Sequence, residues 1–237
     1  MRETMNNDLR LSFHYILRLT FRLVILLTIL ASLLFIPAGR IDWVEAWIFI
    51  GVYGFFLMLY GVWGLWKDPS QFKERSQVAP NTKSWDLIIL AIYTAFLIVL
   101  FIVIGLDAGR SRWSHVPILV EGLGWLGQVL AGAIIFWAVV TNTYLSRVAR
   151  IQEDRGQEVI VTGPYRYIRH PMYIGIIILF LSIPIALGSW WGLIPGVSIS
   201  ILFVIRTAKE DKMLHNELMG YKNYANRVRY RILPGIW

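Results

Sequence analysis

Six apolar runs constrain the fold of this chain more than any other feature. A helix needs about 20 apolar residues to cross the hydrocarbon core of a bilayer, and its backbone polar groups must then be bonded internally. The runs cover Leu19–Ala38, Trp43–Trp66, Trp85–Leu106, Ile118–Tyr144, Met172–Leu187 and Trp190–Ile205. This pattern predicts an all-α fold, a polytopic transmembrane helical bundle of about six spans.

The last two runs are short, and the Gly188-Ser189 pair between them predicts a tight helical hairpin. The segment Thr207–Gly220 then carries apolar residues on one face and charged residues elsewhere, which predicts a C-terminal amphipathic cytoplasmic helix. We expect a single integral membrane domain over 1–237. Its residues 1–144 form four spans, and residues 145–237 form the hairpin with the polar segments on either side.

The balance of charge supports a membrane protein rather than a nucleic-acid-binding one. Of the 237 residues, 57% are hydrophobic and 16% are charged, against about 25% charged in soluble domains. If both termini are cytoplasmic, 20 of the 23 Lys and Arg residues lie on the inner side, as the positive-inside rule expects. We therefore expect a multi-pass protein of the bacterial inner membrane or an equivalent membrane. The absence of cysteine and the scatter of four histidines argue against a metal site.

The stretch Gly163–Gly175, read as GPYRYIRHPMYIG, combines turn-forming, basic and aromatic residues directly before an apolar run. Gly163-Pro164 predicts a turn, and Pro171 favours extended backbone at His170 and a helix that starts at about Met172. Irregular backbone at the end of a membrane helix is tolerated where it lines a wet cavity. We expect the functional site here.

A second motif, Gly122-x-Gly124-x-x-Gly127, matches the dinucleotide-binding fingerprint in its letters alone. That fingerprint requires a preceding strand and a βαβ unit, whereas these glycines lie inside the fourth apolar run. Small residues let membrane helices approach one another closely. We therefore interpret this motif as a packing surface.

Four motifs in order carry a resemblance to a known family. They are Gly163-Pro164-Tyr165, Arg169-His170-Pro171-Met172-Tyr173, Arg206-x-x-x-Glu210-Asp211 and Gly220-Tyr221-x-x-Tyr224. Together they resemble the isoprenylcysteine carboxyl methyltransferase family, which is grouped with the phospholipid methyltransferases, and they suggest a bacterial-type member. The resemblance is strong over 146–237 and continues more weakly upstream through Glu74-Arg75, Lys83-Ser84-Trp85-Asp86 and Arg112-Trp113-Ser114.

The resemblance implies an integral membrane methyltransferase that uses S-adenosylmethionine (SAM), with residues 145–237 as its catalytic core. Glu210 would hold the amino-acid end of the cofactor. Arg206 and His170 are the expected catalytic residues, and Arg206 and Arg169 are expected to bind substrate. The expected cofactor-binding residues are Gln157, Val159, Ile160, Tyr165, His170, Pro171, Met172, Tyr173 and Glu210.

The chemistry of these residues leaves the methyl acceptor open. Arg206 and Glu210 are four residues apart, so they share one face of a helix and can hold acceptor and donor side by side. A carboxylate acceptor is ionised at neutral pH and needs no general base, whereas an amine requires a base, for which His170 is the nearest candidate. The absence of an obvious dedicated base favours a lipophilic carboxylate slightly.

Three alternatives remain at this point. One is a phospholipid N-methyltransferase. Another is an NADPH-dependent membrane reductase of the sterol-reductase kind, which would need several basic groups for the nucleotide phosphate. The third is a non-catalytic membrane protein that keeps the same core. For the methyltransferases, the expected partners are a lipid or lipophilic small molecule and the surrounding membrane lipids.

Overall fold

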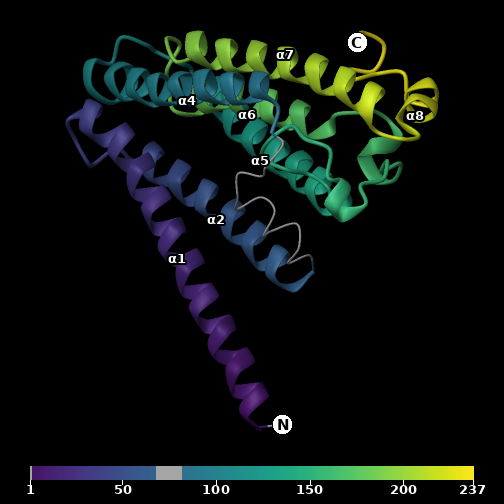
Figure 1. Ribbon diagram of the computed structural model, residues 1–237. Coiled ribbons are helices and arrows are strands. Elements are labelled where there is room, and N and C mark those ends of the chain that lie inside the picture. The colour runs from purple at the N-terminus through teal and green to yellow at the C-terminus, as the bar shows by residue number, and fades with distance from the viewer. Residues whose placement is uncertain (1, 68–81) are drawn as a thin grey trace.

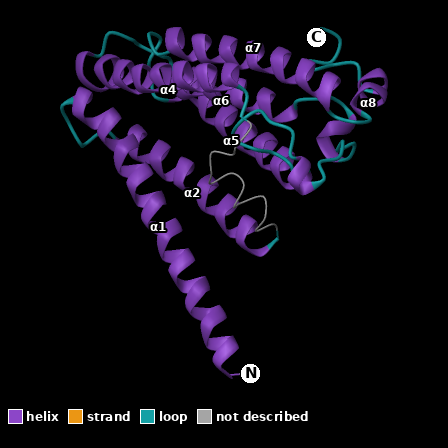
Figure 2. Cartoon of the chain, viewed as in Figure 1, coloured by secondary structure: helices purple, strands orange, loops and turns teal. Residues whose placement is uncertain are grey.

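The computed structural model describes the backbone of residues 2–67 and 82–237, with side chains at residue 17 and from residue 19 onward. In these residues the chain forms helices and loops and no strand (Figure 2). The main helices are α1 (Arg2–Ala38), α2 (Val44–Trp66), α4 (Ser84–Ile104), α5 (Ile118–Thr141), α6 (Pro171–Ala186), α7 (Leu193–Glu217) and α8 (Tyr221–Arg227). Glu74 and Arg75 of the upstream resemblance lie outside the described residues, as does most of the segment between the second and third predicted spans.

Four helical segments are long and apolar enough to cross a membrane, and α6 is a shorter apolar helix. The four segments are Leu19–Ala38, Val44–Trp66, Ser84–Ser111 and Ile118–Thr141. The predicted helical membrane bundle is therefore confirmed. The division of the chain at residue 144 and the cytoplasmic position of both termini stay predictions.

The helical hairpin of α6 and α7 turns at Gly188, whose φ of +74° lies in the left-handed region that glycine adopts readily. One expected boundary is wrong. The segment 207–217 is the second half of α7 and not a separate amphipathic helix. No glycine or proline interrupts residues 197–217, so the helix continues from apolar to polar surroundings without a break.

The third span also extends further than expected, because α4 continues as a π-helix over Gly105–Ser111. The carboxylate of Asp107 in this π-helix is fully buried. It accepts hydrogen bonds from the hydroxyls of Ser114 and Ser189, each at 2.6 Å. Asp107 thereby fixes the turn between α6 and α7 to the end of α4.

Helix α5 packs closely against α6 through glycines. A Cβ atom added at Gly124 would lie 2.5 Å from the backbone nitrogen of Ala186, and one at Gly127 would lie 2.2 Å from Oγ of Ser182. At Gly122, by contrast, an added Cβ meets nothing within 4 Å. Two of the three glycines in the Gly-x-Gly-x-x-Gly motif thus serve helix packing.

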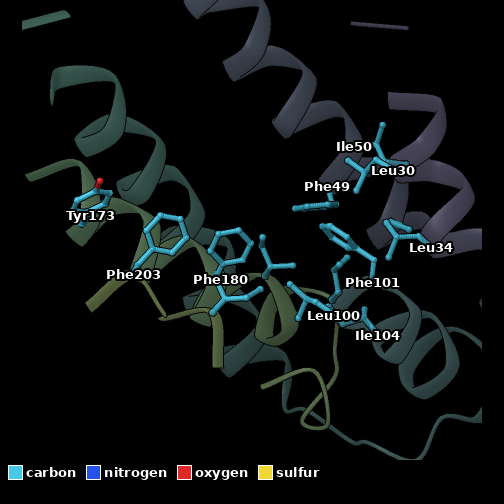
Figure 3. Close-up of a cluster of buried hydrophobic side chains, with 14 of the residues drawn as sticks. Leu30, Leu34, Phe49, Ile50, Leu100, Phe101, Ile104, Tyr173, Phe180 and Phe203 are labelled. Carbon is cyan, nitrogen blue, oxygen red and sulfur yellow. The ribbon is translucent and has the colours of Figure 1, made fainter. Parts of the chain in front are cut away.

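Helices α4 and α7 run side by side along one edge of the bundle, while α1 diverges from it toward its N-terminal end and α2 toward its C-terminal end (Figure 1). Where α1, α2 and α4 meet, Phe49 and Phe101 pack with ring centroids 5.8 Å apart. A row of rings leads away from this point, with Phe180 and Phe203 6.5 Å apart and Phe203 and Tyr173 5.6 Å apart (Figure 3). The row connects the apolar core to the polar end of α6 and α7.

Candidate functional site

The GPYRYIRHPMYIG stretch folds as two turns at the start of α6. Gly163 has a φ of +55°, and a Cβ atom there would lie 2.7 Å from Oγ1 of Thr141, so the position favours glycine twice over. A 3₁₀ helix follows over Gly163–Arg166. His170 precedes α6 in non-helical backbone, and Pro171 is the first helical residue, close to the predicted start at Met172.

A buried carboxylate, that of Asp211 on α7, ties this turn to the C-terminal part of the chain. Arg169 donates from Nε and Nη2 to its two oxygens at 2.8 and 3.1 Å. Arg231 donates from Nε at 2.8 Å, and the Tyr221 hydroxyl donates at 2.9 Å. The Nε2 atom of His170 lies 3.3 Å from the same carboxylate. We call these five residues the Asp211 cluster.

The protonation states follow from these contacts. Burial alone would raise the pKa of Asp211, but hydrogen bonds from His170, Arg231 and Arg169 hold that pKa well below its ordinary value. Burial and the adjacent charge of Asp211 raise the pKa of the Tyr221 hydroxyl above its ordinary value. The cluster therefore contains an ionised carboxylate and a neutral phenol at physiological pH.

Backbone hydrogen bonds add a second link between the turn and the C-terminal segment. The amides of Arg169 and His170 donate to the carbonyls of Tyr230 and Arg231 at 3.0 and 2.9 Å. The Tyr224 hydroxyl on α8 donates to the carbonyl of Tyr165 at 2.8 Å. The turn is thus held on both sides, which leaves little freedom for the side chains that it carries.

Arg206 forms a buried ion pair with Asp86 in the first turn of α4. Its Nε and Nη2 atoms donate to the two Asp86 oxygens at 2.8 and 3.0 Å, and Nη2 also donates to the carbonyl of Arg147 at 2.9 Å. The Asp86 carboxylate accepts a further hydrogen bond from the amide of Ala149 at 2.7 Å. Nη1 of Arg206 has no hydrogen-bond partner among the described residues.

Glu210 lies one helical turn after Arg206, and its carboxylate accepts a hydrogen bond from the Tyr173 hydroxyl. The residue is half-buried. In the described part of the chain, no Lys, Arg or His forms an ion pair with it. This carboxylate is therefore available to a cationic group from outside the chain.

Most of the predicted site residues line one cleft between the His170 turn, the second half of α7 and the loop before the turn. They are Gln157, Val159, Ile160, Tyr165, Arg169, His170, Met172, Tyr173, Arg206 and Glu210. Pro171 is buried at the start of α6 and is not among the lining residues. The structure thus brings together ten of the eleven residues, although the role of each stays a prediction.

The loop wall of the cleft has free backbone polar groups. The side-chain oxygen of Gln157 accepts a hydrogen bond from the amide of Gln152 at 2.8 Å, which fixes the loop locally. The amides and carbonyls of Val159 and Ile160 form no hydrogen bond with any described residue. Half-buried backbone groups of this kind need partners, so they suit recognition of a polar ligand edge.

Sequence reasoning missed the roles of Asp86 and Asp211. Asp86 was noted only as part of an upstream resemblance, and its partner Arg206 lies 120 positions later in the chain. A signal was nevertheless present, because an acid at the start of an apolar run is a functional candidate by default. Asp211 was noted only as part of the Arg206-x-x-x-Glu210-Asp211 motif, whereas it is the centre of the turn's ion pairs.

These features define a class, that of helical integral membrane proteins with a polar cleft at one end of a helical hairpin. Residues 119–219 match the family model described as phospholipid methyltransferase. The match supports the family predicted from the sequence, over a stretch from α5 through the His170 turn to the end of α7. Among curated proteins, none matches the chain. The family indicates methyl transfer at a membrane.

Proposed function

We propose that this protein transfers a methyl group from SAM to a lipophilic acceptor that enters from the bilayer. The observation that carries the proposal is the pair Arg206 and Glu210 on one face of α7, both lining the cleft. Arg206 forms its ion pair with Asp86, whereas Glu210 interacts with Arg206 only at longer range and forms no ion pair in the described chain. The cleft can therefore accept a ligand with a positive charge next to Glu210.

The residues of the cleft fit SAM by their chemistry. Glu210 would bind the ammonium group through a charge-assisted hydrogen bond. The free backbone groups of Val159 and Ile160 would recognise the adenine edge, and Met172 and Tyr165 would supply apolar surface for the ring. When bound, SAM supplies a methyl group that is activated on a sulfonium sulfur.

Arg206 would orient the acceptor through Nη1, because its other donors are held by Asp86 and the carbonyl of Arg147. Arg206 and Glu210 would then hold acceptor and donor one helical turn apart, and alignment is the main requirement of this reaction. The guanidinium suits a carboxylate acceptor, which is ionised at neutral pH and has no proton to lose.

The position of His170 also favours a carboxylate. Its Nε2 atom lies 3.3 Å from Asp211 and 3.4 Å from the Tyr221 hydroxyl, so this nitrogen is engaged in the Asp211 cluster. We propose that His170 and Arg169 position the turn, and that neither removes a proton from the acceptor. A specific observation keeps phospholipid N-methylation as the second candidate, because the matching family model bears the name of phospholipid methyltransferases.

The reductase alternative is less well supported. The arginines that line the cleft are Arg150, Arg169 and Arg206. Each is paired with a carboxylate, that of Asp154, Asp211 or Asp86 respectively. Recognition of a nucleotide phosphate needs several cations that are free to bind it, whereas these three are paired and Arg206 keeps one unbonded donor atom, Nη1.

Calorimetry on the detergent-purified protein tests the proposal, with SAM and NADPH titrated in parallel. Glu210→Gln keeps the size of the side chain and an acceptor for Tyr173 but removes the charge. We expect it to weaken SAM binding by about tenfold to a hundredfold, the range for a hydrogen bond to a charged group. Glu217→Gln is the matched control, because Glu217 lies on the same helix and pairs with Lys83 outside the cleft. Equal SAM affinity in wild type and Glu210→Gln would contradict the assignment of Glu210, and NADPH binding would favour a reductase.

A further inference from the structure

An apolar cavity of about 190 Å³ lies within the membrane part of the protein, between α2 and α5. An apolar cavity of about 150 Å³ is large enough to hold a benzene-sized molecule. The residues that line this one include Val52, Tyr53 and Phe56 of α2 and Gln128, Gly132 and Phe136 of α5. We call it the α2–α5 cavity.

The side-chain amide nitrogen of Gln128 in this cavity lacks a hydrogen-bond partner in the described chain. Gln128 is 3% exposed, and its amide nitrogen has no hydrogen-bond partner among the residues that the structure describes. A buried amide donor without a partner lowers stability, and the bilayer offers no water to satisfy it. Packing alone would be served better by leucine or methionine, so this glutamine points to a ligand.

We propose that the α2–α5 cavity binds the chain of a lipophilic molecule that carries an oxygen acceptor, such as a carbonyl, and that Gln128 donates a hydrogen bond to this oxygen. The apolar walls would hold the chain by burial. The amide would favour one depth in the membrane, because its donor is held at a fixed position on α5. Gln128 would therefore select ligands by the presence and the place of the oxygen.

The cavity runs along α5 toward the cleft described above. Gln128, Gly132, Ile135 and Val139 follow one another on one face of the helix and all line the cavity. The carbonyl of Ala138, beside Val139, accepts a hydrogen bond at 3.5 Å from the Tyr165 hydroxyl, and Tyr165 lines the cleft. Ten residues of α-helix span about 15 Å.

A molecule bound at Gln128 would therefore reach the cleft with a group about 15 Å from its oxygen. This molecule is then the methyl acceptor itself, with its reactive end near Arg206. That last step rests on the proposed function, whereas the binding of an oxygen-bearing chain at Gln128 does not.

Gly132 sets the shape of the cavity. A Cβ atom at this position would lie 2.4 Å from the ring of Phe56, so Gly132→Ala must displace this ring, which forms part of the cavity wall. Gly122→Ala on the same helix meets nothing within 4 Å. The two substitutions form a matched pair that differs only in its effect on the cavity.

The test uses full-length protein in dodecyl maltoside micelles, whose apolar phase contains no carbonyl group. Radiolabelled 9-heptadecanone is the probe, and it is displaced by unlabelled ketone or by heptadecane of equal chain length. In the wild type we expect the ketone to displace the probe at about tenfold lower concentration than the alkane, as the loss of one buried hydrogen bond implies. Gln128→Leu should make the two competitors equal. Gly132→Ala should weaken the binding of both competitors, and Gly122→Ala should change the binding of neither.

Equal displacement by ketone and alkane in the wild type would overturn the proposal, and so would a ketone preference that survives in Gln128→Leu. SAM titration of the same samples keeps the two proposals separate. A wild type that prefers the ketone but does not bind SAM would refute the proposed function and leave the cavity as a lipid site. Thermal unfolding of Gln128→Leu checks that the fold is retained, which we expect because leucine suits an apolar wall.

Discussion

The substitution Asp211→Asn tests how the His170 turn is held in place. It keeps the size of the side chain and removes the charge on which Arg169 and Arg231 converge. Breaking a buried ion pair by removing one partner costs about 3–5 kcal/mol, because the remaining charge is left buried. The Arg169 side chain is 6% exposed, but that of Arg231 is 33% exposed and can regain water. We therefore expect a loss of about 3 kcal/mol in the free energy of unfolding, at the lower end of this range.

Denaturant unfolding of the detergent-solubilised protein measures this loss, with Glu217→Gln as the control. The Lys83–Glu217 pair has side chains that are 34% and 42% exposed, so its removal should cost less than about 1 kcal/mol. If Asp211→Asn unfolds within about 1 kcal/mol of the wild type, the reasoning about the buried cluster is wrong.

The pH dependence of stability is a second test of the charge on the Asp211 carboxylate. Its pKa is lower in the folded protein than the ordinary value of 3.8. The unfolded state therefore binds the proton more readily, and the stability due to Asp211 is complete above this ordinary value and lost as the pH falls further. Between pH 8 and pH 5, the difference in unfolding free energy between His170→Gln/His215→Gln and the same double variant with Asp211→Asn should stay constant, because the imidazoles that contact Asp211 are then absent. A difference that shrinks within this range would contradict an ionised Asp211.

Two further predictions concern helix packing and the Arg206 pair. Gly124→Ala should destabilise the fold by about 1–3 kcal/mol through overpacking against Ala186, while Gly122→Ala should change stability by less than about 0.5 kcal/mol, both by denaturant unfolding. Asp86→Asn leaves Arg206 buried without its counter-charge and should cost about 3 kcal/mol or more. The double variant Asp86→Asn/Arg206→Gln should recover stability but not methyl transfer. Transfer is measured on membranes with radiolabelled SAM, and its recovery in the double variant would exclude Arg206 from acceptor binding.

The features that the sequence predicted correctly are those set by neighbouring residues. Apolar runs of sufficient length define membrane helices whatever surrounds them, and a proline after His170 starts α6 close to the expected position. The packing role of Gly124 and Gly127 was predictable because the motif lies inside such a run. In each case the physical cause acts within a few residues of the chain.

The end of the third span, which was predicted too early, depends on tertiary contacts. The π-helix that extends α4 lies mostly beyond the predicted end of the third run at Leu106, because Asp107 is a poor residue for the end of a membrane helix. It is tolerated there because hydroxyls from Ser114 and Ser189 satisfy its carboxylate, and Ser189 belongs to the hairpin turn 82 residues away. The pairing of Asp86 with Arg206 was missed for the same reason.

Glu210 differs from the other acids around the cleft in how its charge is balanced. Asp86, Asp154 and Asp211 each have an arginine partner, so their charges are balanced within the protein. Glu158, the other acid that lines the cleft, is exposed and solvated. Glu210 is half-buried beside the neutral Asp86–Arg206 pair and is stabilised among the described residues by the Tyr173 hydroxyl. A cationic ligand would balance the negative charge of Glu210. Binding of SAM should therefore raise the stability of the wild type more than that of Glu210→Gln.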